Sequence, residues 1–385
     1  MTSSFPLSAT TPFGLEKVLA EELRSIGAQN VCARRRFVEF TGNKYILYKA
    51  NLWCRTAIRI LKPIARFDIN KEKDLYVEIQ KICWDQYITP ESSITIDSFV
   101  RNSIFTHSLY VSQLTKDAIV DQIRQKTGLR PNVDQVSPDL RLNLHIQNND
   151  AVLSLDSSGA SLHKRGYRVR TNTVPLNEVL AAGILYLTKW DCNSSFIDPM
   201  CGSGTFLIEA AMMAIKRVPG YYRSEFGFMR WLDYDSNLYH SIQDEAKKNE
   251  TGTITFPIIG SDVNKTSYRI ACENIMNANM EELIEVHHCA FEEQIPPAPP
   301  GIMVMNPPYG ERQEVSQLRE RYKTIGDVLK SRYNGYTAYV FTGNMQEAKH
   351  IGLRPSRRIE LFNGAIDCRL YKFDIYAGSR KSVEK

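Results

Sequence analysis

The chain has 385 residues, of which 43% are hydrophobic and 24% are charged, a composition close to the globular average. It excludes disordered, collagen-like and low-complexity classes, and the length favours two or three domains. No apolar run approaches the roughly 20 residues that cross a membrane, and MTSSFPLSAT does not resemble a secretory signal. The eight cysteines include no CxxC pair, so we expect neither a zinc site nor a disulfide framework, and we predict a cytoplasmic location.

The charge is divided unevenly along the chain. Residues 1–170 carry 24 basic and 17 acidic side chains, whereas residues 171–385 carry 24 basic and 26 acidic ones. A basic first half beside a nearly neutral second half is typical of a protein in which one part binds a polyanion. Ordinary surface scatter would give the same counts, so charge alone leaves both interpretations open.

The first half predicts two small α+β units in succession. Periodicity and turn signals indicate, in chain order, a helix over 15–26, a strand over 31–40, a helix over 44–57, a strand over 58–66, a helix over 71–83, a strand over 93–100, a helix over 109–127 and a hairpin around Asn148-Asn149-Asp150. A connector rich in Gly and Arg follows at 159–170, and this change of composition marks the main domain boundary.

From about residue 175 strands and helices alternate, which predicts a parallel sheet with flanking helices. The expected strands cover 195–198, 256–261, 283–287, 301–305 and 336–342. The expected helices cover 175–190, 203–216, 264–279, 315–332 and 344–350. RRIELF and CRLYKFDIY then flank Asn363-Gly364, a dipeptide suited to hairpin turns. A mostly parallel sheet that ends in an antiparallel hairpin is typical of class I methyltransferases.

The first candidate site is FIDPMCGSGTFLIEAA. A predicted strand ends at Asp198, a glycine-rich turn follows, and a helix begins at Thr205. Glycine lets the backbone approach a ligand closely, and the start of a helix offers free N–H groups. The segment matches neither GxGxxG nor a P-loop, and a plain tight turn is the other interpretation.

The second candidate is Asp262 in IIGSDVN, at the end of the next predicted strand. A carboxylate at this place can accept both hydroxyls of a ribose, as it does in related sheets that bind NAD. The alternative is that Asp262 caps the helix that begins at Asn264.

The third candidate is MVMNPPYGER, at the end of the fourth strand. Pro307 and Pro308 stiffen the loop and hold a backbone carbonyl outward. That carbonyl and the side-chain oxygen of Asn306 can accept both hydrogens of a planar amine and orient its lone pair toward a methyl donor. Tyr309 can stack on the ring that bears the amine. Catalysis would then rest on positioning, without a strong base; a rigid surface turn is the other interpretation of the motif alone.

These motifs occur in the same order in a known family. DPMCGSGT, GSD and NPPYGER resemble the motifs of THUMP-domain class I methyltransferases, most closely the RlmL-type 23S rRNA guanine-N2 methyltransferases. RPNVDQVSPDLRLNLHI resembles the family's THUMP segment, and LHKRGYRVRTNTVPLNEVLAAG resembles its linker and first methyltransferase helix. The resemblance covers nearly the whole chain, from FGLEKVLAEEL to the final hairpin.

The resemblance implies an α/β protein in four parts. A ferredoxin-like domain would occupy residues 1–65, a THUMP RNA-binding domain 66–160, a linker 161–174, and a Rossmann-like methyltransferase domain 175–385. The first two domains would grip structured RNA, and the last would use S-adenosylmethionine. Longer members of the family carry a second methyltransferase domain after this one, which these 385 residues lack.

The resemblance also assigns site residues. The methionine end of the cofactor would lie along Asp198, Pro199, Cys201, Gly202, Ser203, Gly204 and Thr205, and its ribose at Asp262. The family places an Asp after the third strand for the adenine amine, whereas this chain has His288 in EVHHCAFEEQ. Asn306, Pro307, Pro308 and Tyr309 would form the catalytic set. No metal is expected.

Basic side chains supply the candidate RNA contacts, with solvated surface positions as the alternative. They are Arg34, Arg35, Arg36, Lys164, Arg165, Arg168 and Arg170. If they contact phosphates, binding should weaken steeply with salt. The target guanine would be splayed out of its stack so that its amine reaches a buried methyl group.

The sequence therefore predicts an S-adenosylmethionine-dependent RNA guanine-N2 methyltransferase that acts on large-subunit rRNA. A tRNA guanine-N2 methyltransferase is the nearest alternative, because THUMP modules also occur in tRNA-modifying enzymes. Glutamine methylation of release factors and adenine-N6 methylation of DNA also use NPPY, but a basic, THUMP-like front half argues against both. A non-catalytic RNA-binding assembly factor is the non-enzyme alternative. The sequence does not indicate an oligomeric state.

Overall fold

The computed structural model describes residues 4–170, 176–308 and 315–377. The described chain forms two compact units that exchange segments of sequence. Unit 1 contains the residues up to Thr11, then Leu19–Leu162 and Arg223–Glu245. Unit 2 contains Pro12–Val18, His163–Tyr222 and the residues from Ala246 onward.

The first part of unit 1 has ferredoxin-like topology. Its elements are β1 (Phe5–Thr10), α1 (Glu16–Ser25), β2 (Gln29–Arg34), β3 (Phe37–Gly42), α2 (Lys44–Trp53) and β4 (Arg59–Asp68). The strands lie in the order β2-β3-β1-β4, and every neighbouring pair is antiparallel. α2 begins where the side chain of Asn43 accepts a hydrogen bond from the amide of Ile46, a common helix cap.

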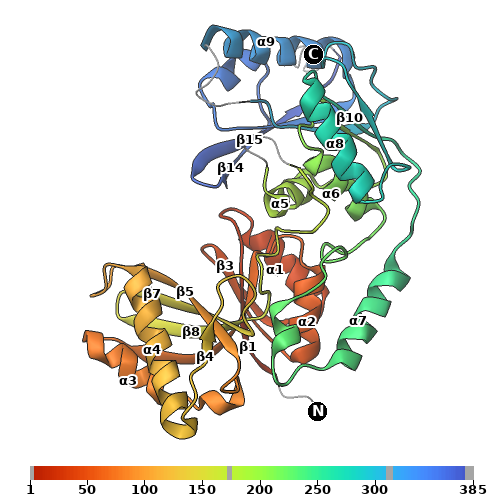
Figure 1. The fold of residues 1–385 in the computed structure, drawn as a ribbon. Helices are drawn as coiled ribbons and strands as arrows, with labels where there is room; N and C mark the ends of the chain where they lie inside the picture. Colours follow the sequence, from red (N-terminus) through yellow and green to blue (C-terminus); the bar gives the residue numbers. More distant parts are fainter. Residues whose placement is uncertain (1–3, 171–175, 309–314, 378–385) are drawn as a thin grey trace. The chain divides into compact units, whose positions relative to one another are not determined.

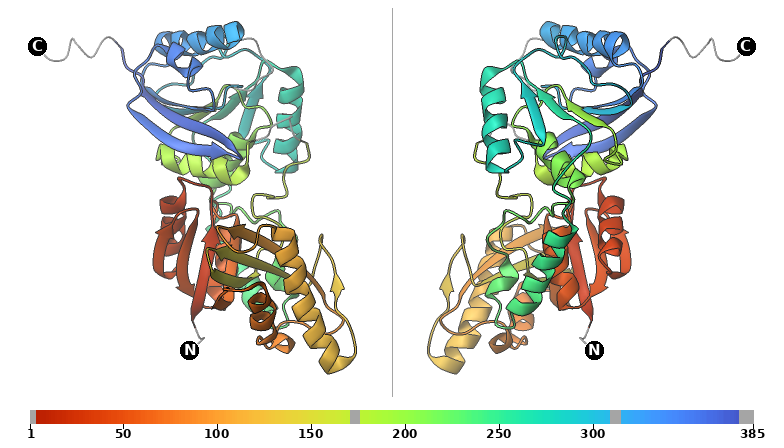
Figure 2. Two further views of the ribbon diagram at one scale, coloured as in Figure 1. Left: turned by 90° about the vertical axis from the view of Figure 1, so that its left-hand side faces the viewer. Right: turned by 90° about the vertical axis from the view of Figure 1, so that its right-hand side faces the viewer.

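The second part of unit 1 extends the same sheet. It comprises α3 (Glu72–Gln80), the short 3-10 helix η1 (Trp84–Gln86), β5 (Ser93–Arg101), α4 (Ser108–Thr127), β6 (Asn132–Val133), β7 (Leu140–Gln147) and β8 (Asp150–Asp156). The sheet continues from β4 through β8, β7 and β5 to β6, and Figure 2 shows α4 lying along these strands. The boundary expected near residue 65 therefore falls inside β4, in a strand that pairs with both parts.

Unit 2 is built on one seven-stranded sheet (Figure 1). The elements from α5 onward are α5 (Glu178–Thr188), β9 (Ser195–Asp198), α6 (Thr205–Ala214), η2 (Gly227–Arg230), α7 (Ser236–Asn249), β10 (Ile258–Ser261), α8 (Lys265–Asn277), β11 (Ile284–His287), β12 (Gly301–Met305), α9 (Val315–Arg332), β13 (Tyr336–Thr342), η3 (Glu347–Ile351), β14 (Arg357–Asn363) and β15 (Ile366–Asp374). The strand order is β11-β10-β9-β12-β13-β15-β14. The first five strands are parallel, and β15 pairs antiparallel with both β13 and β14. This is the predicted class I methyltransferase sheet with its terminal hairpin.

Alternating side chains of the central strands divide the core of unit 2 between the two faces of the sheet. Phe196 of β9 joins the cluster formed with α5 and α6, whereas the next residue, Ile197, joins the cluster formed with α9. This period of two is that of a strand buried on both faces. Figures 1 and 2 show α9 on one side of the sheet and α5 and α6 on the other. The sandwiched strands therefore present only their ends to solvent.

Several predicted elements differ from the structure. The segment 31–40, predicted as one strand, is the β2–β3 hairpin, in which Arg36 has φ of +68°. The predicted helix over 344–350 is the 3-10 helix η3. β1 and α7 were not predicted. The insertion that carries η2 and most of α7 belongs to unit 1, where Phe228 stacks on Tyr48 with ring centroids 4.1 Å apart.

Candidate active site

The candidate site lies at the carboxyl ends of the parallel strands of unit 2. β9 has β10 on one side and β12 on the other, so the strand order reverses there. Ligands of open α/β sheets bind outside the strand ends at such a switch point. Asp198 ends β9, Asp262 follows β10, and Asn306 follows β12. The topology therefore brings the three predicted motifs to one edge of the sheet.

The loop from Asp198 to Thr205, here called the glycine loop, is held in a shape that requires glycine. Gly202 and Gly204 have φ of +55° and +79°, values that favour residues without a Cβ. The amide of Cys201 donates to the carbonyl of Ser261 at 2.9 Å, and the amide of Gly202 donates to Oδ2 of Asp262 at 2.9 Å. The loop is thus fastened to the end of β10, and α6 begins directly after it.

Asp198 is an unusual carboxyl because it is 1% exposed. Its Oδ1 accepts a hydrogen bond from the amide of Met200 at 3.3 Å, and no ion pair reaches it among the described residues. Burial, and after it the nearby charge of Asp262, raises the pKa of Asp198 well above its usual range. Such a group is suited to a cationic ligand, which would restore its charged form.

Asp262 does not cap α8. The cap is Asn264, whose Oδ1 accepts hydrogen bonds from the amides of Thr266 and Ser267. Asp262 instead accepts the amide of Gly202 with Oδ2 and the amide of Asn264 with Oδ1. Burial raises the pKa of this half-buried carboxyl. The alternative of a helix cap is therefore wrong, and the carboxylate lies beside the glycine loop.

The side chain of Asn306 carries a buried hydrogen-bond acceptor, Oδ1. Its Oδ1 is shielded from solvent and has no hydrogen-bond partner in the part of the chain that the structure describes. Buried polar atoms are seldom left in this state. Pro307 is buried and Pro308 is exposed, whereas the predicted stacking residue, Tyr309, lies outside the described residues. The amide oxygen is therefore available to a ligand N–H.

His288, the proposed adenine contact, lies beyond β11. Its Nε2 donates to the carbonyl oxygen of Val263 at 3.2 Å, and its ring lies 5.7 Å from that of Tyr268. The imidazole is exposed. It thus borders the loop that carries Asp262.

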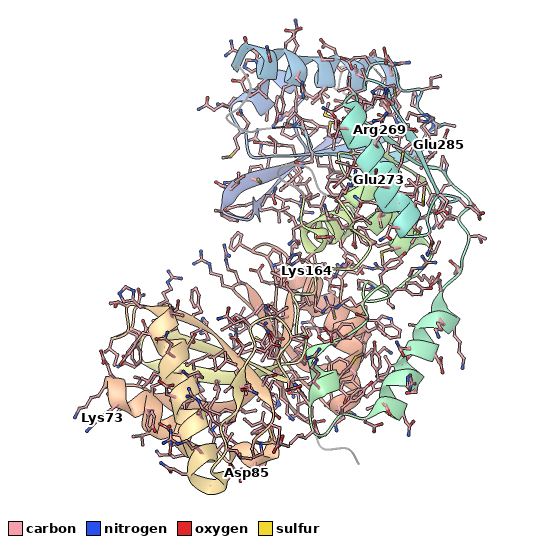
Figure 3. All side chains as sticks on the ribbon, viewed as in Figure 1. Lys73, Asp85, Lys164, Arg269, Glu273 and Glu285 are labelled. Atoms are coloured by element: carbon pink, nitrogen blue, oxygen red, sulfur yellow. The ribbon has the colours of Figure 1, made fainter. Side chains whose placement is uncertain are left out.

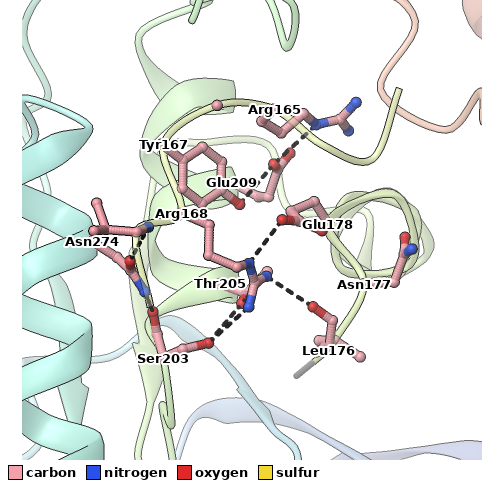
Figure 4. Close-up of polar contacts among 12 residues, drawn as sticks. Arg165, Tyr167, Arg168, Leu176, Asn177, Glu178, Ser203, Thr205, Glu209 and Asn274 are labelled. Carbon is pink, nitrogen blue, oxygen red and sulfur yellow. Dashed lines mark hydrogen bonds and ion pairs between the residues drawn. The ribbon is translucent and has the colours of Figure 1, made fainter. Parts of the chain in front are cut away.

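Two of the predicted RNA contacts are internal side chains (Figure 4). Arg165 is 2% exposed and pairs with the fully buried Glu209 of α6, with Nε 3.3 Å from Oε1. Arg168 pairs with Glu178 of α5 at 2.8 Å, and the side-chain exposures are 13% and 6%. Both guanidinium groups thus have carboxylate partners inside unit 2 and expose little surface, and their assignment as RNA contacts stays a prediction.

The other predicted RNA contacts are on the surface. Arg34, Arg35, Arg36, Lys164 and Arg170 are all exposed, and Lys164 is labelled in Figure 3. Arg34 pairs with Glu39 across the β2–β3 hairpin at 2.9 Å, and Arg170 lies 3.4 Å from Glu273 of α8. These positions are accessible to a large anionic ligand.

The structure also adds residues that lie outside the sequence motifs. Glu178 and Asn274 hold the linker 163–170 against the glycine loop through Arg168 and Val169. The sequence carried a signal for Glu178, because it is an acidic residue in the otherwise apolar helix NEVLAAGILYL and lies close to a run of arginines. Asn274, a polar residue in the middle of a helix, gave no comparable signal.

Two other kinds of site are absent from the described ranges. In them, no three His, Cys, Asp or Glu side chains gather in a group that could hold a metal ion. None of the helices in those ranges is long and apolar enough to cross a membrane.

Comparison with known proteins supports the arrangement. The family described as RMKL-like, methyltransferase domain, matches residues 165–372, the RlmL ferredoxin-like domain matches 6–61, and the THUMP domain matches 70–156. A Synechocystis protein named "Putative RNA methyltransferase" is 40% identical over 96% of this chain and 97% of its own length. The ribosomal RNA large subunit methyltransferase K/L of Syntrophotalea carbinolica is 39% identical over 97% of this chain but only 54% of its own length.

A solved structure is similar over its full length. SMU.472, described as "a putative methyltransferase complexed with SAH", superposes with a TM-score of 0.89 at 26% identity and covers 98% of this chain and 100% of its own. The chain therefore belongs to the RMKL-like methyltransferase family, in the form that carries RlmL ferredoxin-like and THUMP domains before the methyltransferase domain.

Proposed function

We propose that this protein is an S-adenosylmethionine-dependent methyltransferase that modifies the exocyclic N2 amine of a guanine in large-subunit rRNA. The observation that carries the proposal is the buried Oδ1 of Asn306, which has no hydrogen-bond partner among the described residues, at the end of β12, the strand adjacent to the one that ends at Asp198. The names of the K/L relatives support rRNA as the substrate, and the THUMP match supports RNA binding.

The residues present fit the cofactor. S-adenosylmethionine, when bound, supplies a methyl group activated by a sulfonium, and it carries an ammonium group that a carboxylate can pair with. Asp198 is the buried carboxyl for that cation, and the glycine loop permits close approach of backbone amides. Asp262 holds the loop and offers further acceptor capacity for ribose hydroxyls. The similar SMU.472 was solved with SAH, the demethylated form of this cofactor.

Asn306 and the loop that follows it would position the amine. The Oδ1 of Asn306 accepts one amine N–H, and a carbonyl held by Pro307 and Pro308 accepts the other, which turns the nitrogen lone pair toward the activated methyl group. Restraining two reactants in this way replaces a large entropic part of the barrier. Tyr309, proposed by family resemblance, would stack on the guanine.

RNA binding is assigned to the first two domains, proposed at residues 1–65 and 66–160, with the methyltransferase domain at 175–385. We expect the triple variant Arg34→Gln, Arg35→Gln, Arg36→Gln to lower the slope of log K against log salt by roughly 2 to 3, since each phosphate contact contributes about 0.7–0.9. Binding to an rRNA fragment at several salt concentrations measures this. A triple Gln variant of Lys247, Lys248 and Lys330, which are exposed and lie outside the two proposed RNA-binding domains, is the charge-matched control. Equal slopes for the two triple variants would contradict a specific role for the hairpin arginines.

The function itself is tested by methyl transfer from labelled S-adenosylmethionine into separated rRNA, tRNA and protein, followed by digestion of the labelled RNA to nucleosides. N2-methylguanosine in large-subunit rRNA is the expected product. The same nucleoside in tRNA would keep the chemistry and change the substrate. Label in glutamine or in N6-methyladenine would contradict guanine specificity, and the absence of cofactor binding would favour an assembly factor.

A further inference from the structure

The linker His163–Arg170 does more than join two units. It begins directly after Leu162, where the chain leaves unit 1, and it belongs to unit 2. Within unit 2 its side chains and backbone make hydrogen bonds to the glycine loop and to the helices beside that loop (Figure 4). We call this segment the linker strap.

Arg168 forms the main connection between the strap and the loop. Its Nη1 donates to Oγ of Ser203 at 3.1 Å, and its Nη2 donates to Oγ1 of Thr205 at 2.9 Å. Nη2 also donates to the carbonyl of Leu176 at 3.0 Å, and Nε donates to Oε1 of Glu178 at 2.8 Å. One planar guanidinium thus contacts four acceptors in fixed directions, which an ammonium on a flexible stem cannot reproduce.

The backbone of the strap is fastened independently by Asn274 of α8. Its Oδ1 accepts from the amide of Val169 at 2.9 Å, and its Nδ2 donates to the carbonyls of Ser203 at 3.0 Å and Arg170 at 3.2 Å. Ser203 is therefore held at its side chain by Arg168 and at its carbonyl by Asn274. Ser203 lies between Gly202 and Gly204, whose positive φ values shape the loop.

These contacts are buried. Ser203 and Thr205 are 7% and 4% exposed, and the Arg168–Glu178 pair is mostly buried as well. Loss of a hydrogen bond in such a place leaves an unpaired polar group away from water, which is costly. Water is therefore a poor substitute for the guanidinium, and the loop depends on the strap for its shape.

We propose that Arg168 is a positioning residue for cofactor binding: through the hydroxyls of Ser203 and Thr205 it fixes the glycine loop in the conformation that receives S-adenosylmethionine. The inference rests on the proposed function, because it needs the glycine loop to be the cofactor loop. The sequence predicted that Arg168 contacts RNA phosphates. The inference instead gives Arg168 a role inside unit 2, where it affects binding of the cofactor and not of the RNA.

The test measures the Kd of SAH for the full chain by calorimetry, together with thermal stability. Arg168→Lys keeps a charge for Glu178 and removes the planar fork, and the double variant Ser203→Ala, Thr205→Val removes the acceptors while leaving the ion pair. Each is expected to raise the Kd at least tenfold, and combining all three substitutions should raise it little further, because both changes break the same contacts. Glu178→Gln separates loss of the ion pair from loss of the loop contacts and should raise the Kd less than Arg168→Lys.

Arg170→Lys is the matched control, since it lies on the same strap, is exposed and does not contact the loop in any described bond. Its Kd for SAH should equal that of the parent, and Arg168→Lys should keep the parent's affinity for RNA. The inference would be overturned if the folded Arg168→Lys protein and the folded Ser203→Ala, Thr205→Val protein both bind SAH within twofold of the parent. That result would leave the proposed function intact. A parent chain that binds no SAH would refute the cofactor assignment, and the inference with it.

Discussion

Replacement of Asn306 by alanine is expected to lower the rate of methyl transfer by about 100-fold or more, the range seen when one preorganised hydrogen-bonding group is removed from an active site. The variant loses the buried Oδ1 that is unpartnered in the described chain and is available for the amine. Because that oxygen belongs to the amine side of the site, the affinity for SAH should stay close to that of the parent. Single-turnover rates with saturating rRNA and calorimetry with SAH measure the two quantities separately.

Asn193→Ala is the matched control for this experiment. Asn193 is exposed in the turn before β9, so its removal should leave both the rate and the SAH affinity unchanged. The variant Asn306→Ala should also be at least as stable as the parent, since it removes a buried acceptor that no described residue satisfies. Full methylation activity in Asn306→Ala would refute the catalytic assignment.

Replacement of Asp198 by asparagine should weaken SAH binding by about 100-fold, because losing one partner of a buried charge pair costs roughly 2–5 kcal/mol. The same substitution is expected to raise the melting temperature of the protein without cofactor. The reason is that the parent must keep a carboxyl in a buried place where ionisation is unfavourable. Calorimetry and thermal unfolding of the two proteins, with and without SAH, measure both effects.

The pH dependence has a definite sign. Folding raises the pKa of Asp198, so the native state holds this proton more tightly than the unfolded state does. The stability contributed by the protonated group is complete below the unfolded pKa and is lost as pH rises through the folded pKa. The advantage of Asp198→Asn in melting temperature should therefore grow with pH, whereas SAH binding by the parent should strengthen over the same rise. A difference in melting temperature that does not change with pH would contradict a buried, titrating Asp198.

The active-site motifs could be placed from the sequence because parallel strands put their carboxyl ends on one edge. Once Asp198, Asp262 and Asn306 were each assigned to the end of a strand, their proximity followed from the fold class. Their local environments did not follow. Whether Asp262 caps α8 or binds the glycine loop depends on a contact with Gly202, 60 residues away in the chain, and no short pattern encodes it.

Of the sequence features, charge was the least reliable guide to which side chains lie on the surface. Arg165 and Arg168 occur in a sequence as basic as that around Arg34, yet they lie inside unit 2 because Glu209 and Glu178 are buried beside them. A run of arginines is identical in sequence whether its partners are phosphates or carboxylates. Only the three-dimensional positions of the acidic residues, one of them on a helix 44 residues downstream, distinguish the two cases.

The elements that the sequence did not predict have weak local sequence signals. β1 is FPLSAT, with few strand-forming residues, although it lies between β3 and β4 in the sheet. The β2–β3 turn has no Gly or Asn at its centre; Arg36 adopts the positive φ instead. α7 is mostly polar, and its first ten residues are stabilised within unit 1, where Glu245 pairs with Lys49 at 2.6 Å. In each case, tertiary contacts override a weak local preference.

The exchange of segments between the two units has a consequence for biosynthesis. Residues Pro12–Val18 belong to unit 2, and Arg223–Glu245 belong to unit 1. During translation the amino-terminal unit therefore cannot be completed when residue 162 leaves the ribosome; it must wait about 80 residues longer for the aromatic side chains around Phe228. At an elongation rate of about 5–20 residues per second this delay lasts about 4–16 seconds. No single cut in the chain therefore separates the two units, because each of them contains residues from both sides of Leu162.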